Sequence, residues 1–188
     1  PTTPLITDSA AVATGANCTA CAVTGLNKGA GLQKTDVGRF ISFNSGIAKV
    51  TSRTSTTVVV CEILTAFTNT DAKSDWKLGA FSDTTGHPSC VSFFEQRLVF
   101  AGTTNEPQTL YFSKSGDYEN MTTGTNADDA MVYTIASNQV NRIRYLKAQR
   151  TLIVGTTGGE FTVSADGTDA AITPSNIVIK KQSSYGTA

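Results

Sequence analysis

Residues 92–121, SFFEQRLVFAGTTNEPQTLYFSKSGDYENM, decide the fold of this chain. Aromatic and β-branched residues at 93–100 predict one strand, because such side chains pack well on a pleated sheet. The polar segment 102–108 contains Gly, Asn and Pro, which favour turns. Residues 109–113 predict a returning strand, and residues 115–117 have turn chemistry. Because two short strands cannot bury their own apolar face, we expect them to belong to a larger sheet.

The same pattern returns further along the chain. Residues 97–104, RLVFAGTT, are similar to residues 151–157, TLIVGTT, with an offset of 54 residues between Leu98 and Leu152. Each copy is followed by a second predicted strand and by a turn that contains Gly and Asp. Repeats of about 40–50 residues with several strands each indicate propeller blades. Two hairpins of an ordinary β-sandwich are the alternative.

The pattern of the whole chain predicts an all-β fold in two domains. Residues 1–67 predict a small β-barrel or sandwich domain, residues 68–75 a polar linker, and residues 76–188 about two blades of a propeller-like platform. Residues 56–64, TTVVVCEIL, form a continuous β-branched run that is typical of a strand buried on both faces. Trp76, Leu78, Ala80 and Phe81 predict a strand that enters the second domain. Leu98–Phe100 and Leu152–Val154 are expected to be core once neighbouring sheets cover them.

Composition limits the classes of function. Of the 188 residues, 16% are charged, and 15 Lys and Arg balance 15 Asp and Glu. A net charge near zero predicts no general attraction to nucleic acid or to an anionic membrane. Low charge with abundant Thr, Ser, Gly and Ala is typical of extracellular or virion β-proteins. The sequence has no apolar run near the roughly 20 residues that a membrane-spanning helix needs. Its first residue is Pro1 and not Met, which predicts that the true start lies elsewhere or has been removed.

The four cysteines are Cys18, Cys21, Cys61 and Cys90. Cys18 and Cys21 form a Cys-x-x-Cys, which can supply half of a zinc site or a redox pair. A second pair with this spacing is missing, so chance spacing along a strand is the preferred interpretation. Cys61 lies within VVVCEIL and is predicted to be a small buried apolar residue. We expect all four to be thiols.

Candidate catalytic groups are few. A Ser/His/Asp site would have to use His87, the single histidine, which lies in a Gly-His-Pro turn. Asp128–Asp129 and the pair Asp117 and Glu119 offer neighbouring carboxylates. Adjacent strand residues point to opposite faces, and neither run has the spacing of a calcium loop. We therefore predict solvated loop acids, and assign no catalytic, cofactor-binding or metal-binding residue.

Four basic residues, Arg142, Arg144, Lys147 and Arg150, form the densest positive cluster. Arg142 and Arg144 alternate with Ile143 and Tyr145, which places both arginines on one face of a strand. This face is a candidate contact with a neighbouring subunit or with DNA. An ordinary solvated face is the alternative.

Several blocks resemble a known family. In chain order they are DVGRFI, DWKLGAFSDTTGHPSCVSFF, FFEQRLVFAGT, PQTLYFSKSGDYENM, DDAMVYTIAS, NQVNRIRYL, LIVGTTGGEFTV and KKQSSYG, within residues 35–186. They are similar to the nozzle protein (tail tubular protein B) of short-tailed bacteriophages. The resemblance implies a fragment of a longer virion structural protein with a β-propeller-like platform.

The same resemblance implies partners and a location. Copies of the chain would form a ring, which the family suggests is a hexamer, at the tail of a virion assembled in the bacterial cytoplasm. An adaptor, tail fibres and DNA in transit would be its partners. The prediction is therefore a structural protein, not an enzyme. A carbohydrate- or receptor-binding module is the alternative, for which Trp76, Tyr111, Tyr118 and Tyr133 are candidate aromatics, and a glycan-cleaving enzyme is a third.

Overall fold

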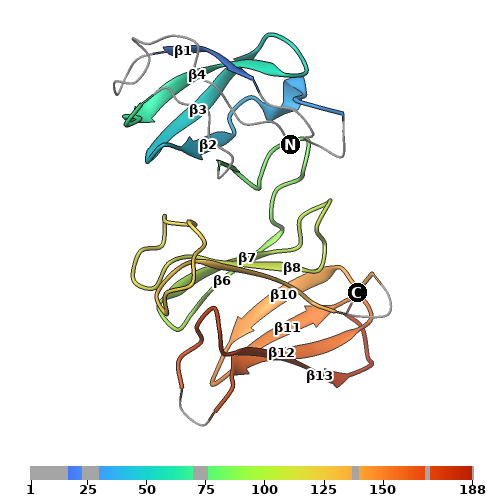
Figure 1. The fold of residues 1–188 in the computed structure, drawn as a ribbon. Helices are drawn as coiled ribbons and strands as arrows, with labels where there is room; N and C mark the ends of the chain where they lie inside the picture. Colours follow the sequence, from blue (N-terminus) through green and yellow to red (C-terminus); the bar gives the residue numbers. More distant parts are fainter. Residues whose placement is uncertain (1–16, 23–29, 70–75, 137–139, 168–169, 188) are drawn as a thin grey trace. The chain divides into compact units, whose positions relative to one another are not determined.

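The computed structural model describes residues 17–22, 30–69, 76–136, 140–167 and 170–187, and it divides the chain into two units, Pro1–Gly86 and His87–Ala188 (Figure 1). Both units are built from antiparallel strands, which confirms the predicted all-β class. The only helical element among the described residues is a 3-10 turn at Lys34–Asp36.

The first unit contains one five-stranded sheet. Its strands are β1 (Asn17–Ala22), β2 (Phe40–Phe43), β3 (Gly46–Arg53), β4 (Val58–Thr65) and β5 (Lys77–Leu78), in the order β1-β4-β3-β2-β5. The predicted barrel or sandwich is therefore replaced, in the part of the chain that the structure describes, by a single open sheet. Its core contains Leu32, Ile41, Ala48, Val50, Val59, Cys61, Ile63 and Phe67.

Strand β4 is buried on one face and not on both. Val59, Cys61 and Ile63 are buried, whereas Glu62 and Leu64 between and beyond them are exposed. Among the described residues, no second layer covers the other face of β4, although the β-branched run places side chains on it. The prediction of a strand was correct, but the prediction of two buried faces was wrong.

Residues 76–86 belong to the first unit, although the sequence placed them in the second domain. Strand β5 pairs with β2 through Ile41 and Leu78. Arg39 Nη1 and Asp36 Oδ1 form a buried ion pair at 2.9 Å. Arg39 Nε also donates to the carbonyl of Gly79 at 2.7 Å, so the ion pair fixes the segment that contains β5. Most of the predicted linker, residues 70–75, lies outside the described residues.

The second unit contains two four-stranded sheets stacked face to face (Figure 1). In both sheets the strands pair in sequence order, as an antiparallel meander. The first sheet comprises β6 (Cys90–Phe94), β7 (Arg97–Ala101), β8 (Thr109–Phe112) and β9 (Met131–Thr134). The second comprises β10 (Ile143–Ala148), β11 (Leu152–Thr156), β12 (Gly159–Ala165) and β13 (Ile177–Ser183).

The single strand predicted at 93–100 is instead part of a hairpin formed by β6 and β7. Glu95 and Gln96 both have positive φ, 45° and 58°, and join β6 to β7. Two consecutive residues of positive φ are the mark of a type I′ turn, whose usual sequences are Asn-Gly and Asp-Gly. Because Glu-Gln lacks that signature, the turn was not predicted.

The two sheets share one hydrophobic core. Every strand contributes residues to it, among them Val99, Leu110 and Phe112 from the first sheet and Leu152, Val154 and Val163 from the second. Strands β6 and β10 meet where Cys90 Sγ donates to the carbonyl of Ile143 at 3.8 Å. The sheets therefore form one packed unit with two outward faces.

Candidate functional site

The outward face of the sheet β6–β9 is mostly apolar, and we call its apolar part the apolar face. It consists of Val91, Phe93, Leu98, Phe100, Tyr111 and Val132. Thr109 and Thr134, whose hydroxyls are hydrogen-bonded at 2.9 Å, lie on the same outward face. Strand register aligns Val91, Phe100, Tyr111 and Val132 in one row across all four strands, because cross-strand partners share a face. Val91 and Phe93 are each 60% exposed and Val132 is 47% exposed. Exposed apolar patches of this kind mark interaction sites more often than isolated exposed residues do.

Phe100 lies on this face and not in the core. Its side chain is half-buried, while Val99 next to it is completely buried. The expectation that the whole run Leu98–Phe100 is core was therefore wrong for Leu98 and Phe100. In the second sheet, likewise, Leu152 and Val154 are core and Ile153 faces outward.

An aromatic pair lies at one end of the apolar face. The rings of Phe93 and Tyr118 meet edge to face, with centroids 5.1 Å apart. Tyr118 is 44% exposed. Of the aromatic residues proposed for glycan contact, Tyr111 is buried, Tyr133 is half-buried and donates to the carbonyl of Pro174, and Trp76 packs on the core of the first unit. Tyr118 alone among those four has a largely exposed ring.

Arg97 holds the connection between β8 and β9, which carries Tyr118. Its side chain is only 2% exposed. Nη1 donates to the carbonyls of Ser113 and Asp129 at 2.8 and 2.7 Å, and Nη2 donates to that of Ala127 at 2.7 Å. Burial lowers the pKa of Arg97, while Asp128, Glu95 and Asp129 oppose this shift. A guanidinium keeps its charge in proteins, so these are strong charge-assisted hydrogen bonds.

The outward face of the second sheet is mostly polar, although Ile153 and Val178 also lie on it. Tyr145 Oη donates to Glu160 Oε1 and Ser183 Oγ donates to Glu160 Oε2, each at 3.1 Å. Burial raises the pKa of Tyr145, and the Glu160 carboxylate raises it further. The exposed side chains of Lys147 and Lys180 lie on the same face, aligned through the register of β10 to β13.

The four basic residues predicted to meet a partner or DNA are all exposed. Arg142 precedes β10, Arg144 and Lys147 lie in it, and Arg150 lies in the turn to β11. The predicted alternation holds for Ile143, which is in the core, but fails at Tyr145. A register shift between Ile143 and Tyr145 turns Tyr145 outward and puts Leu146 against the core. The basic groups are therefore spread along an edge strand.

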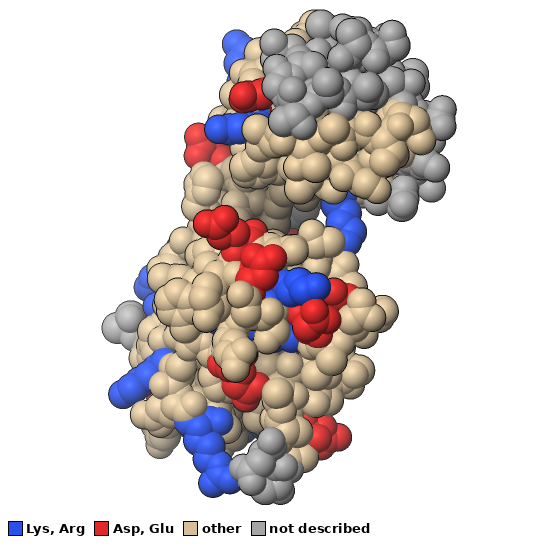
Figure 2. Space-filling view, turned by 90° about the vertical axis from the view of Figure 1, so that its left-hand side faces the viewer, with Lys and Arg blue, Asp and Glu red and all other residues tan. Residues whose placement is uncertain are grey.

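Charges of both signs are mixed on the face of the second unit shown in Figure 2. Asp and Glu predominate in its upper half, and Lys and Arg lie along its lower edge. One exposed ion pair joins Lys114 Nζ to Asp128 Oδ2 at 2.9 Å. This contact lowers the pKa of Asp128 and raises that of Lys114, in both cases first through the hydrogen bond between them. A mixed surface does not provide the broad positive field that non-specific DNA binding uses.

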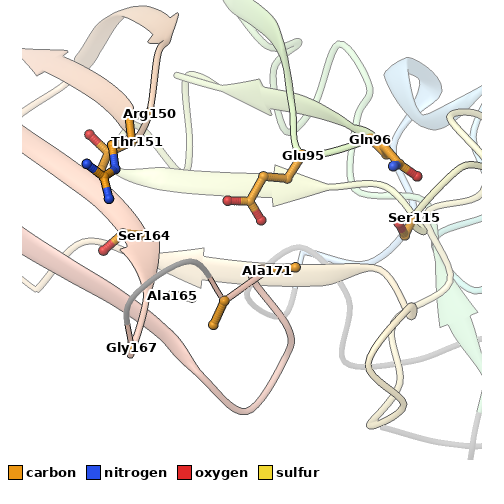
Figure 3. A pocket seen from close by; sticks show the side chains of 10 residues that line it. Glu95, Gln96, Ser115, Arg150, Thr151, Ser164, Ala165, Gly167 and Ala171 are labelled. Atoms are coloured by element: carbon orange, nitrogen blue, oxygen red, sulfur yellow. The ribbon is translucent and has the colours of Figure 1, made fainter.

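A pocket of about 640 Å³ lies at the turn end of the two sheets. Its polar lining residues are Glu95, Gln96, Ser115, Arg150, Thr151 and Ser164, and small Ala and Gly residues complete it. Figure 3 shows the carboxylate of Glu95 extending toward the side from which Arg150 and Ser164 come. One oxygen of Glu95 is held by the amide of Ile172 at 2.6 Å. The pocket offers a carboxylate and hydroxyls to a small polar molecule, but none of its lining side chains is aromatic.

The other candidate groups do not converge. His87 is exposed at the start of the second unit. Asp128 pairs with Lys114, and Asp129 Oδ2 accepts from the amide of Asn126 at 2.9 Å. Asp117 and Glu119 are exposed. The described residues contain no cluster of three or more His, Cys, Asp or Glu that could hold a metal ion.

Two of the four cysteines can be described. Cys61 and Cys90 are buried free thiols, which confirms the prediction for Cys61. The backbone of Cys18 and Cys21 lies in β1, but their side chains lie outside the described residues. Among the described helical residues, none forms a helix of the length and apolarity that crossing a membrane requires.

No protein-family model and no curated protein sequence matches this chain.

Proposed function

We propose that this chain is a structural component of a bacteriophage tail, related to the nozzle proteins, that works through subunit assembly. The observation that carries the proposal is the apolar face. Val91, Phe93 and Val132 expose apolar surface in an otherwise well-packed sheet, and such surface is stabilised when another protein covers it. Each of the family-like blocks from residue 93 onward overlaps a strand of the second unit.

The topology of the second unit supports a propeller-like platform. A propeller blade is a four-stranded antiparallel sheet, and blades stack face to face around an axis. Both sheets of the second unit have four strands in meander order and stack on one core. On this proposal the chain contributes two blade-like sheets to a ring of copies, in the virion, with an adaptor and tail fibres as neighbours and without catalytic turnover.

The proposal is tested by quantitative mass spectrometry of purified particles of the virus that encodes the chain. Peptides of the chain are expected at a fixed small ratio to the other tail proteins, because a ring contains a defined number of copies. Particles that are infectious but contain no peptide of the chain would contradict the proposal.

DNA passage is a separate part of the proposal and rests on the exposed Arg142, Arg144, Lys147 and Arg150. Each phosphate contact makes DNA affinity fall with salt concentration. The affinity of the chain for duplex DNA is measured at two salt concentrations. The double variant Arg142→Glu with Arg144→Glu is expected to bind DNA more weakly, and its affinity is expected to depend less on salt concentration. Binding that the double variant leaves unchanged would remove DNA contact from the proposal.

A carbohydrate- or receptor-binding module is the second candidate, and the exposed Phe93–Tyr118 pair favours it. Glycan recognition uses exposed aromatic rings next to polar groups, and the Lys114–Asp128 ion pair lies on the loops that carry Tyr118. A glycan array probed with the chain separates the candidates. Specific binding that Tyr118→Ala abolishes, with folding unchanged, would favour the second.

A further inference from the structure

We infer that the outward face of the second sheet binds a carbohydrate, with the ring of Tyr145 as the platform for one sugar ring and Glu160 as an acceptor for its hydroxyl groups. The inference goes beyond the proposed structural role, which needs no ligand. The site is also distinct from the Phe93–Tyr118 pair, because Phe93 lies in β6 and Tyr118 in the connection that follows β8.

The ring of Tyr145 lies flat on the sheet. Its cross-strand neighbour on β11 is Gly155, which has no side chain. A Cβ built on Gly155 would be nearest to Cε1 of the ring, and Cζ and Cδ1, the two atoms bonded to Cε1, would be only slightly further away. A point beyond the rim of the ring would be clearly further from those two atoms, so this point lies under the ring. One face of the ring therefore rests on the backbone of β11, and the other is directed away from the sheet.

The carboxylate of Glu160 is fixed at the edge of this ring. Tyr145 Oη and Ser183 Oγ each donate to one of its two oxygens at 3.1 Å. A carboxylate oxygen has room for a second hydrogen bond, so Glu160 remains an acceptor for the hydroxyl groups of a ligand. All three side chains are half-buried. Because they are held in place before a ligand arrives, binding costs little side-chain entropy.

The next row of the same face supplies further groups. Strand register aligns Lys147, Ile153, Thr162 and Lys180 from β10 to β13. Gln182 Nε2 donates to Thr162 Oγ1 at 2.9 Å, and both lysines are exposed. Within the second unit, no described strand covers this face (Figure 1). A ligand that stacks on the ring therefore meets donors, acceptors and an apolar side chain on an open surface.

This set of groups matches a sugar better than it matches other common ligands. One face of a pyranose ring presents C–H groups, whose slight positive charge is attracted to the negative face of an aromatic ring. Its hydroxyl groups both donate and accept, so they complement the Glu160 carboxylate and the lysine ammonium groups. A nucleic acid would bring phosphate charge close to that carboxylate. An apolar partner would remove water from the charged groups without replacing its hydrogen bonds.

The test uses the whole chain and a glycan array of hexose, N-acetylhexosamine and hexuronate oligosaccharides. At least one of these classes is expected to bind, and isothermal titration calorimetry then measures the affinity for that oligosaccharide. Tyr145→Ala is expected to weaken binding about tenfold or more, because it removes the platform and one donor to Glu160. Tyr145→Phe keeps the ring and is expected to weaken binding less. Tyr118→Ala, the matched control at the other exposed aromatic, is expected to bind like the wild type.

Thermal unfolding shows whether each variant is folded. Glu160→Gln, which keeps the shape of the side chain but not its charge, replaces Tyr145→Ala if that variant unfolds, and it is also expected to weaken binding. Absence of binding to all of these classes at millimolar oligosaccharide would overturn the inference. Binding that the Tyr145→Ala or replacement variant leaves unchanged, or that Tyr118→Ala abolishes, would also overturn it. The structural role does not depend on these results, because it is tested by the presence of the chain in particles.

Discussion

The sheets β6–β9 and β10–β13 have the same topology and contribute to the same core, yet their outward faces differ. In the first sheet the outward row is Val91, Phe100, Tyr111 and Val132. In the second sheet Tyr145, Glu160 and Ser183 form a hydrogen-bonded group. The inward faces are alike because the two sheets cover each other. On the proposed function, the outward face of the first sheet meets another protein, whereas the outward face of the second sheet meets water or a polar partner.

The largest expected effect tests the shared core. Leu110 in β8 and Leu152 in β11 are both completely buried, one in each sheet. Replacing either with Ala is expected to cost about 2–5 kcal/mol. Because the core is common, each variant should lower hydrogen-exchange protection in both sheets. Loss of protection confined to the mutated sheet would show that the two sheets are independent.

The next effect is specific to the first sheet. Arg97→Met leaves the buried carbonyl of Ser113 and the partly buried carbonyls of Ala127 and Asp129 without this donor, at a cost of roughly 3 kcal/mol in the free energy of unfolding. Urea unfolding measures the loss. Arg144→Met is the control, since Arg144 is exposed and its replacement should change stability little. Equal stability of Arg97→Met and the wild type would mean that the loop does not depend on Arg97.

A smaller effect is expected in the second sheet at Gly155. A Cβ there would overlap the ring of Tyr145, so Gly155→Ala must displace the ring and weaken its bond to Glu160. Overpacking of this kind costs about 1–3 kcal/mol. In a Tyr145→Ala background the same change should cost much less. Identical costs in the two backgrounds, measured by thermal unfolding, would show that the ring is not responsible.

The smallest effect concerns the exposed ion pair of Lys114 and Asp128. The lowered pKa of Asp128 stabilises the fold above the ordinary carboxyl pKa, and this contribution is lost as pH falls through the lowered value. The raised pKa of Lys114 contributes below the ordinary lysine pKa and is lost at higher pH. The ion pair therefore stabilises the fold between roughly pH 4 and pH 10. Titration of Asp128 followed by NMR should show its pKa rise in Lys114→Met, and an unchanged value would exclude the contact.

Much of the fold could be predicted from alternation of apolar residues, which locates the strands of the second unit. The Glu95–Gln96 turn could not, because neither residue is a usual carrier of positive φ. The place of β5 depends on the buried pair Asp36 and Arg39, whose contacts with residues 79–82 are distant in sequence. Local patterns do not contain that information.

The candidate surface was partly visible in the sequence. Between residues 90 and 100 apolar side chains occupy both alternating sets, which is the pattern of a strand buried on two faces. The same pattern at residues 56–64 belongs to a strand with one buried face, whereas at Val91 and Phe93 it marks an exposed apolar face. Arg97 was missed because an arginine in a strand is usually exposed, and Tyr145 was misplaced because a bulge shifts the alternation by one residue.

The most direct test of the structural role compares particles that encode Val91→Lys with Val132→Lys and particles that encode Val178→Lys. Both proteins should fold, because the substituted side chains lie on outward faces. Quantitative mass spectrometry of purified particles is expected to find Val178→Lys at the wild-type level and the double variant strongly depleted. Incorporation of the folded double variant at the wild-type level would contradict the claim that the apolar face is a contact surface in assembly.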